Sequence, residues 1–191
     1  MTRRILPALA GLALLAFLIS PGSFAPLFQP FTRNNAPAIY TQTSLLSLTL
    51  SHLAIVAVAV AASTIAGLVL AILVTRGAGR EFLPLARTVI AVGQTFPPVA
   101  VLALAVPVMG FGTGPTLVAL FLYGLLPVFE NALAGLSGQP APVAEAARAM
   151  GLTPRQRLWQ IDLPLALPLL LAGMRLTAVI SLGTATIGST V

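Results

Sequence analysis

Hydrophobic residues along this chain gather into long runs that shorter polar stretches separate. Five of these runs reach or approach the length of about 20 residues that a helix needs to cross a bilayer. The pattern therefore predicts an all-α, polytopic membrane protein with about five transmembrane helices. The expected spans cover residues 5–20, 45–74, 88–109, 115–136 and 163–191.

The first run (5–20) follows a basic start and allows two interpretations. A basic end, a short apolar core and small residues beyond it are typical of a cleaved signal peptide. The alternative is an uncleaved anchor that continues through Pro21 towards Leu27, which we favour because the rest of the chain is equally apolar. The domains expected are an N-terminal anchor helix with an extracytoplasmic, proline-rich loop (1–43) and a transmembrane domain (44–191).

Arginines flank the apolar runs and predict their orientation. Cytoplasmic loops carry an excess of basic residues, and one face collects nearly all of them if the runs cross alternately. We therefore expect a protein of the cell membrane with a cytoplasmic N-terminus and a short, charged cytoplasmic loop at 75–87. The arginines on that face are Arg3, Arg4, Arg76, Arg80, Arg87, Arg148, Arg155 and Arg157, and only Arg33 falls on the other.

The longest polar interval is predicted to form two short helices with a joint, here called the helix–Gly–helix segment (143–164). Strong helix formers precede Gly151, which stands where a helix commonly ends in a left-handed residue. Thr153, Pro154 and Gln156 then form the pattern of an N-cap, a first helical proline and a capping box. Pro164 is expected to close the second helix, so that the segment makes a compact knob for a socket on another protein.

Composition excludes several functions. With 58% hydrophobic and 7% charged residues, the chain is not a soluble globular domain. All ten basic residues are arginines, so the chain lacks the lysine of a P-loop and is not expected to hydrolyse nucleotide. No cysteine, one histidine and four acidic residues leave no material for a metal site, and we expect no cofactor. The net charge of +6 is spread over helix ends rather than one basic face, which argues against nucleic-acid binding.

Polar residues within the expected spans are candidates for a translocation path. Gln94, Thr95 and Pro97 begin the third span, where proline frees backbone carbonyls; this stretch is either a gate or a simple kink. In the fourth span, Glu130 and Asn131 lie near its cytoplasmic boundary, which favours an interfacial carboxylate over a proton carrier. Arg175 is the last candidate. Two roles are open to it: pairing with Glu130 or lining the path.

The helix–Gly–helix segment also carries a family resemblance. Glu145-Ala146-Ala147, three residues, Gly151, nine residues, Ile161, one residue and Leu163-Pro164 is similar to the EAA loop of permease subunits of binding-protein-dependent ABC importers. The resemblance implies that this loop docks into a groove on a separate ATPase, with Glu145 and Gly151 at the contact. A carboxylate in the first turn of a helix would also favour the helix dipole.

The resemblance further implies several partners. These are an ABC ATPase subunit, an extracytoplasmic substrate-binding protein, a second permease chain in a homodimer or heterodimer, and membrane lipid. Because the chain stops at Val191 inside an apolar run, while related permeases continue, we expect a sixth span to be missing at the C-terminus.

Further stretches resemble permeases for quaternary-ammonium osmoprotectants such as glycine betaine, choline and carnitine. They are Gly93–Pro97, Gly110–Gly112, Tyr123–Pro127 with Asn131, Ala172–Arg175 and Gly183–Gly188. The alternatives are an ABC permease for another small solute, such as an amino acid, and an ion-coupled secondary transporter. The last would need ionisable residues at mid-membrane depth and usually an internal repeat, and neither is evident.

Overall fold

The computed structural model describes residues 2–32, 36–40 and 42–188, and within these ranges it contains helices and no strand. The all-α fold predicted from the hydrophobic runs is thereby confirmed. The chain divides into two units, residues 1–54 and 55–191. Arg33, the one arginine expected on the extracytoplasmic face, lies outside the described residues.

The N-terminal unit contains a bent pair of helical segments rather than one long anchor. Helix α1 (Thr2–Ile19) ends before Pro21, and the chain then turns by 113° into three short helices, η1 (Pro21–Phe24), α2 (Ala25–Phe28) and η2 (Gln29–Phe31). The expected continuation through Pro21 towards Leu27 in one straight helix is wrong, as is the expectation that this stretch is loop throughout. The reason is local: proline cannot continue a helix, and the ring of Phe17 packs edge-on against Phe24 at 5.4 Å between centroids.

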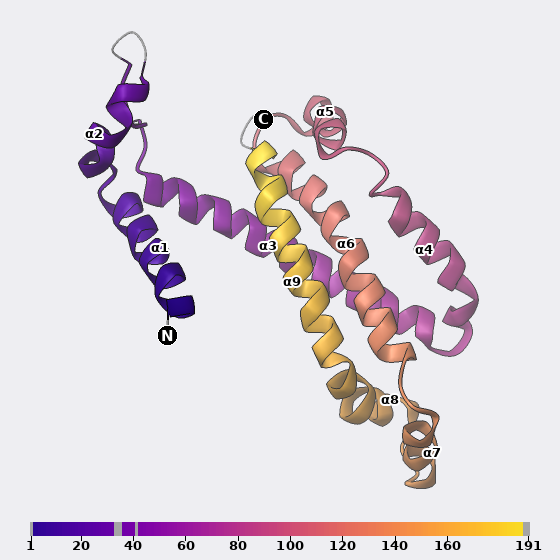
Figure 1. The fold of residues 1–191 in the computed structure, drawn as a ribbon. Coiled ribbons are helices and arrows are strands. Elements are labelled where there is room, and N and C mark those ends of the chain that lie inside the picture. Colours follow the sequence, from indigo (N-terminus) through magenta and orange to yellow (C-terminus); the bar gives the residue numbers. More distant parts are fainter. Residues whose placement is uncertain (1, 33–35, 41, 189–191) are drawn as a thin grey trace. The chain divides into compact units, whose positions relative to one another are not determined.

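Among the described residues, three helices are long and apolar enough to cross a membrane (Figure 1). They are α3 (Leu45–Thr75), α6 (Thr113–Ser137) and a continuous helix over Pro154–Gly188. The first two agree with the spans predicted at 45–74 and 115–136. Counting the bent N-terminal pair gives up to four, so the number of five stays a prediction.

The third expected span is not one helix. It divides into α4 (Leu83–Val92) and α5 (Pro98–Met109), with a break over residues 93–97. The proline pair Pro97-Pro98 explains the break, because the residue before a proline avoids the helical region and the second proline can begin a new helix. The charged loop expected at 75–87 is also shorter than predicted, since it contains a 3-10 helix, η3 (Gly77–Phe82), and α4 already starts at Leu83.

Helices α6 and α9 (Leu163–Gly188) form the central pair of the larger unit, because glycines let their backbones approach closely. A Cβ atom on Gly135 would lie 2.8 Å from the Cβ of Ala166, and one on Gly173 would lie 3.0 Å from the carbonyl oxygen of Pro127. Helix α3 packs onto the same pair, and a Cβ on Gly67 would lie 3.1 Å from the backbone nitrogen of Phe129. Small residues of α3 therefore lie at a helix contact.

The polar segment after α6 leads into the last span without a stop. Helix α7 (Ala141–Ala149) is separate, but α8 (Pro154–Arg157) continues through a π-helical turn (Leu158–Asp162) into α9. The expectation that Pro164 closes the second helix of the segment is wrong. Pro164 is the second residue after the π turn, and the wider turn accommodates a residue that lacks a backbone donor.

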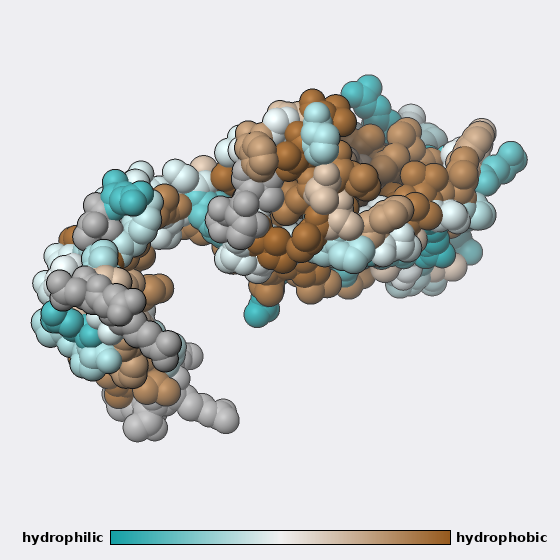
Figure 2. All heavy atoms as spheres, turned by 90° about the horizontal axis from the view of Figure 1, so that it is seen from above, coloured by the Kyte–Doolittle hydropathy of each residue, from teal (hydrophilic) through white to brown (hydrophobic). Residues whose placement is uncertain are grey.

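Hydrophobic side chains cover much of the surface of this unit (Figure 2). Val58, Ile65 and Val69 on α3 are between 48% and 66% exposed, and Val179 on α9 is 61% exposed. An exposed apolar surface of this extent suits contact with lipid rather than water. The chain is therefore a multi-pass membrane protein.

Candidate functional site

The helix–Gly–helix segment turns at Gly151 in the way the sequence predicts. Gly151 has a φ of +73°, which side-chain-bearing residues rarely adopt. Its N–H donates to the Arg148 carbonyl at 2.9 Å, and the N–H of Leu152 donates to the Ala147 carbonyl at 3.1 Å. This pair of bonds is a Schellman motif, and it satisfies carbonyls that the end of α7 leaves without a helical partner.

Two residues after the glycine, a capping box starts the next helix. The backbone N–H of Gln156 donates to Oγ1 of Thr153 at 3.3 Å, and the backbone N–H of Thr153 donates to Oε1 of Gln156 at 2.9 Å. Pro154 occupies the first turn. Both predicted helix ends are thus confirmed, and the joint between them is held by backbone geometry on each side.

Helix α7 presents one small residue inward and its charged residue outward. Ala147 is fully buried, whereas Glu145 and Ala146 are exposed. Glu145 is the fifth residue of α7, so the expectation that it lies in the first turn of a helix is wrong. Its carboxylate is consequently free to meet a partner, and a role in satisfying the start of its own helix is not available to it.

Beyond the joint, the apolar residues of the motif differ in exposure. Ile161 and Leu163 are half-buried and Pro164 is exposed. Leu158 and Leu163 pack against one hydrophobic core cluster of this unit, whereas Trp159 is 64% exposed. The segment is therefore attached to the spans by its apolar side while its outer side stays open. The buried residues of that core are Ala71, Val74, Ile90, Phe129, Ala132, Leu133, Leu136, Ala166 and Leu170.

A buried carboxylate that the sequence analysis did not single out fixes this segment to the rest of the unit. Asp162 is fully buried and forms ion pairs with Arg76 and with Arg157, the latter at 3.2 Å from Nε. Its backbone carbonyl accepts a hydrogen bond of 2.9 Å from Nε2 of Gln139. The ion pairs and the hydrogen bond connect the end of α3, the α6–α7 linker and the π turn. The signal in the sequence was the scarcity of acidic residues, since a carboxylate within an apolar run requires a cationic partner.

Within the membrane-spanning part, Pro127 gives rise to a polar contact between two segments. Proline has no N–H, so the carbonyl of Tyr123, four residues earlier, loses its helical partner. Nε2 of Gln94 donates to that carbonyl at 2.7 Å. The break in the third span therefore places Gln94, a predicted path residue, on the freed backbone of α6.

Two neighbouring carbonyls of α6 also accept bonds from other helices. Oγ of Ser63 on α3 donates to the Phe121 carbonyl at 3.1 Å, and Oγ1 of Thr177 on α9 donates to the Gly124 carbonyl at 3.0 Å. Both hydroxyl residues are fully buried. Neither was a predicted site residue.

The remaining path candidates form contacts of other kinds. Oγ1 of Thr95 donates to the Val92 carbonyl at 2.7 Å, and Pro97 precedes the first residue of α5, so both shape the break itself. Nδ2 of Asn131 donates to the Pro127 carbonyl of its own helix at 2.8 Å.

Glu130 pairs with Arg87 and not with Arg175. Its two carboxylate oxygens accept bonds of 3.0 and 3.1 Å from Nε and Nη2 of Arg87 on α4. The suggested pair with Arg175 is therefore wrong, because α4 begins early enough to bring Arg87 beside α6. Arg175 is exposed and forms no ion pair among the described residues.

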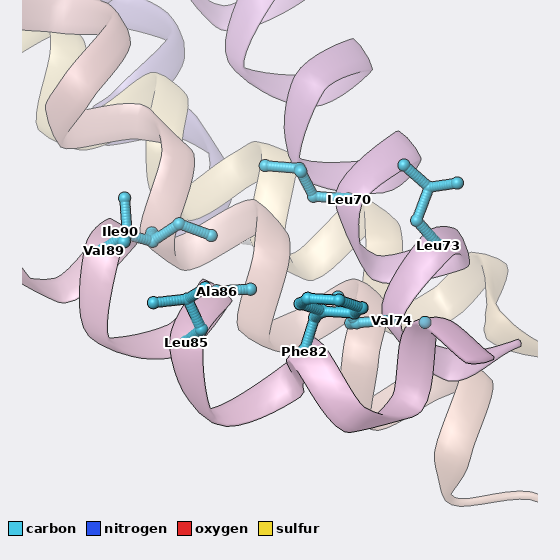
Figure 3. A pocket seen from close by; sticks show the side chains of 9 residues that line it. Leu70, Leu73, Val74, Phe82, Leu85, Ala86, Val89 and Ile90 are labelled. Atoms are coloured by element: carbon cyan, nitrogen blue, oxygen red, sulfur yellow. The ribbon is translucent and has the colours of Figure 1, made fainter.

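An apolar groove of about 400 Å³ lies between the end of α3, η3 and α4 (Figure 3). Phe82 and Leu85 stand on its outer side opposite Leu70 and Leu73. Since no polar side chain lines the groove, it offers nothing to a polar or charged solute. Its full lining is Leu70, Leu73, Val74, Gly79, Phe82, Leu85, Ala86, Val89 and Ile90.

Comparisons with known proteins agree with the resemblance. A family model described as "Binding-protein-dependent transport system inner membrane component" matches residues 63–191. The chain is 42% identical over 144 residues to the osmoprotectant import permease protein OsmY of Salmonella typhimurium, covering 75% of this chain and 61% of the relative. It is 33% identical over 148 residues to the choline transport system permease protein OpuBB of Bacillus subtilis, covering 76% and 66%. The carnitine transport permease protein OpuCB of Listeria monocytogenes is 39% identical over 101 residues, covering 53% and 46%. The chain thus spans less than two thirds of the length of these relatives.

Proposed function

Because the chain belongs to the family of inner membrane components of binding-protein-dependent transport systems, we propose that it is the permease subunit of an ATP-driven importer for quaternary-ammonium osmoprotectants. A separate ABC ATPase hydrolyses ATP, and an extracytoplasmic protein delivers the substrate. A second permease chain completes the path, since two ATPases require two docking segments. The protein lies in the cell membrane with its N-terminus in the cytoplasm.

The observation that carries this proposal is the geometry of the helix–Gly–helix segment. Its Schellman motif and capping box fix the joint at Gly151, and its outer side carries the exposed carboxylate of Glu145. Asp162 binds the same segment to α3 through Arg76. A docking element of this kind would transmit a movement of the ATPase to the membrane spans. Its joint at Gly151 and its attachment to α3 are both held by specific contacts, so little of the movement would be absorbed by bending.

The substrate class rests on the named relatives, which import osmoprotectants, choline or carnitine. Aromatic cages are the usual recognition sites for quaternary ammonium ions. With one Trp and two Tyr in the chain, the permease has few residues for such a cage. Selection of the substrate is therefore assigned to the extracytoplasmic binding protein, and the permease supplies the path.

We assign the gate of this path to the break in the third span. Gln94 and the Tyr123 carbonyl form the contact that joins the break to α6. Irregular backbone at membrane depth occurs where it is buried in protein or lines a cavity. Separation of Gln94 from α6 would let α4 and α5 move relative to each other without breaking a helix.

Uptake of labelled glycine betaine tests the proposal. The chain is expressed with its operon partners in cells that lack other osmoprotectant transporters, as wild type and as Glu145→Arg. Uptake is expected to depend on ATP and to fall by at least about tenfold in Glu145→Arg, a loss that corresponds to about 1.4 kcal/mol of coupling. The matched control is Glu81→Arg, which makes the same charge reversal at an exposed glutamate outside the segment and is expected to retain uptake.

Each result bears on a different part of the proposal. If the chain copurifies with an ATPase but takes up no betaine, it would still be a subunit of an ATP-driven importer, and its substrate would be another solute, for example an amino acid. Uptake that persists without any ATPase would overturn the proposal of an ABC importer and favour an ion-coupled transporter. Equal uptake in Glu145→Arg and wild type would remove Glu145 from the docking contact.

A further inference from the structure

A second cavity, of about 320 Å³, lies at the end of the spans next to the helix–Gly–helix segment. It is bounded by the end of α3, by η3, by the end of α6 and by α8. Unlike the apolar groove, it has a polar lining that includes two guanidinium groups, those of Arg80 and Arg157. Its remaining lining residues are Val74, Thr75, Leu83, Leu136, Ser137 and Gln139.

The charges around this cavity do not balance. Arg76, Arg80 and Arg157 bring three positive charges to it or to its immediate border, and Asp162 brings one negative charge. Asp162 is shared between Arg76 and Arg157, so Arg80 has no carboxylate partner among the described residues. The neighbouring Glu81 is exposed and pairs with none of the three.

Donor atoms remain available on these side chains. Arg80 uses only Nε, which donates to the Thr75 carbonyl at 3.0 Å. Arg157 uses only Nε, toward Asp162 at 3.2 Å. The terminal Nη atoms of both groups have no hydrogen-bond partner in the described part of the chain. One further buried donor beside the cavity, Nε of Arg76, likewise has none.

We propose that this cavity binds an oxyanion of the phosphate class, either the phosphate of a phospholipid headgroup or free phosphate. A guanidinium presents paired N–H donors that match phosphate oxygens, and such charge-assisted bonds are strong. The volume exceeds that of a single water, about 30 Å³, by roughly tenfold, so a phosphate fits with part of a headgroup or with bound water. The expected cytoplasmic location of the arginines puts the cavity at headgroup level.

Occupation of the cavity would stabilise a specific contact between elements. The anion would bridge Arg80 on η3 and Arg157 on α8, and so add a second attachment of the helix–Gly–helix segment beside Asp162. Binding that favours the folded arrangement raises its stability by mass action. The anion therefore acts on the segment that we propose docks the ATPase, but binding itself is measurable without transport.

Thermal unfolding of the full chain in micelles of dodecyl maltoside, a detergent without phosphate, tests the proposal. Potassium phosphate is compared with potassium chloride at matched ionic strength, because screening alone changes exposed charges. At about ten times its dissociation constant, phosphate is expected to raise the midpoint by about 3 °C. A second sample contains phosphatidylglycerol in the same micelles without added phosphate.

Two variants assign the effect to the cavity. Arg80→Gln keeps a donor for the Thr75 carbonyl but removes the free charge, and it is expected to abolish the shift. Arg155→Gln removes an exposed arginine of the same α8 outside the cavity and is expected to behave as wild type. A shift with free phosphate identifies the soluble anion as a ligand, and a shift with phosphatidylglycerol alone identifies the headgroup. The absence of both shifts in wild type, or equal loss in the two variants, would overturn the proposal.

Discussion

Among the residues that the structure describes, Asp162 is the one carboxylate whose side chain is fully buried. Removing a carboxylate from water is costly, and attraction to Arg76 and Arg157 offsets the cost only while all partners are present. Its contribution is therefore asymmetric: the intact cluster adds little to stability, whereas loss of one member leaves charges without compensation. The cluster specifies where the segment attaches to α3.

Asp162→Asn is expected to lower the free energy of unfolding by about 3 kcal/mol, because two partly buried guanidinium groups lose their counter-ion while side-chain volume is retained. Unfolding by a denaturing detergent in mixed micelles measures the difference. Glu145→Gln is the matched control, since it makes the same chemical change at an exposed carboxylate and should alter stability by less than about 0.5 kcal/mol. Equal stability of Asp162→Asn and wild type would show that the cluster is not formed.

At the scale of residues, contacts between neighbours in the sequence could be predicted, whereas contacts between residues far apart in the sequence could not. Gly151 and the Thr153 capping box are local patterns, and both were predicted with their roles. The attachment of Asp162 to Arg76 was missed because the two residues lie 86 positions apart, although its other partner, Arg157, is only five residues away. The pairing of Glu130 was assigned to the wrong arginine for a related reason, since Arg87 was expected in a loop and lies in a helix.

At the scale of elements, the break between α4 and α5 and the proline in α6 belong together. The break separates two helices and supplies Gln94, whereas Pro127 lies inside the continuous helix α6 and frees the Tyr123 carbonyl. Gln94, Thr95 and the pair Pro97-Pro98 interrupt the apolar run between α4 and α5, but a kink within one span would carry the same pattern. The prolines were visible in the sequence, but their effect depends on which neighbour satisfies the freed carbonyl.

Gln94→Leu is expected to leave the Tyr123 carbonyl without a donor and to lower the free energy of unfolding by about 2 kcal/mol. If the break is the gate, betaine uptake should also change. Thr95→Val is the matched control, because the hydroxyl it removes bonds only to the carbonyl of Val92 in its own segment. A Gln94→Leu protein as stable and as active as Thr95→Val would contradict both the contact and its role.

At the scale of the whole molecule, orientation follows from the arginines that flank the spans. Basic residues remain on the cytoplasmic side during insertion. The chain has no cysteine, so a single introduced cysteine reports its own location without background. Suitable positions are exposed and outside every contact described above, as Ala36 and Ala149 are.

In intact spheroplasts, a membrane-impermeant maleimide is expected to label Ala36→Cys and not Ala149→Cys. Both should react after permeabilisation, which controls for accessibility. The positive-inside rule is the physical reason, since it puts the N-terminus and α7 in the cytoplasm and the first loop outside. If only Ala149→Cys were labelled in intact cells, the protein would have the opposite orientation in the membrane.

The unbroken run from Pro154 to Gly188 has a mechanical consequence. It approaches α6 closely at Gly173, beside the Pro127 carbonyl, and this point divides it into arms of about 28 Å and about 22 Å. Such a rod would act as a lever with its fulcrum near mid-length. A small displacement of α8 would then produce a displacement of similar size and opposite direction at the Gly188 end. One movement would therefore close one end of the path while it opens the other.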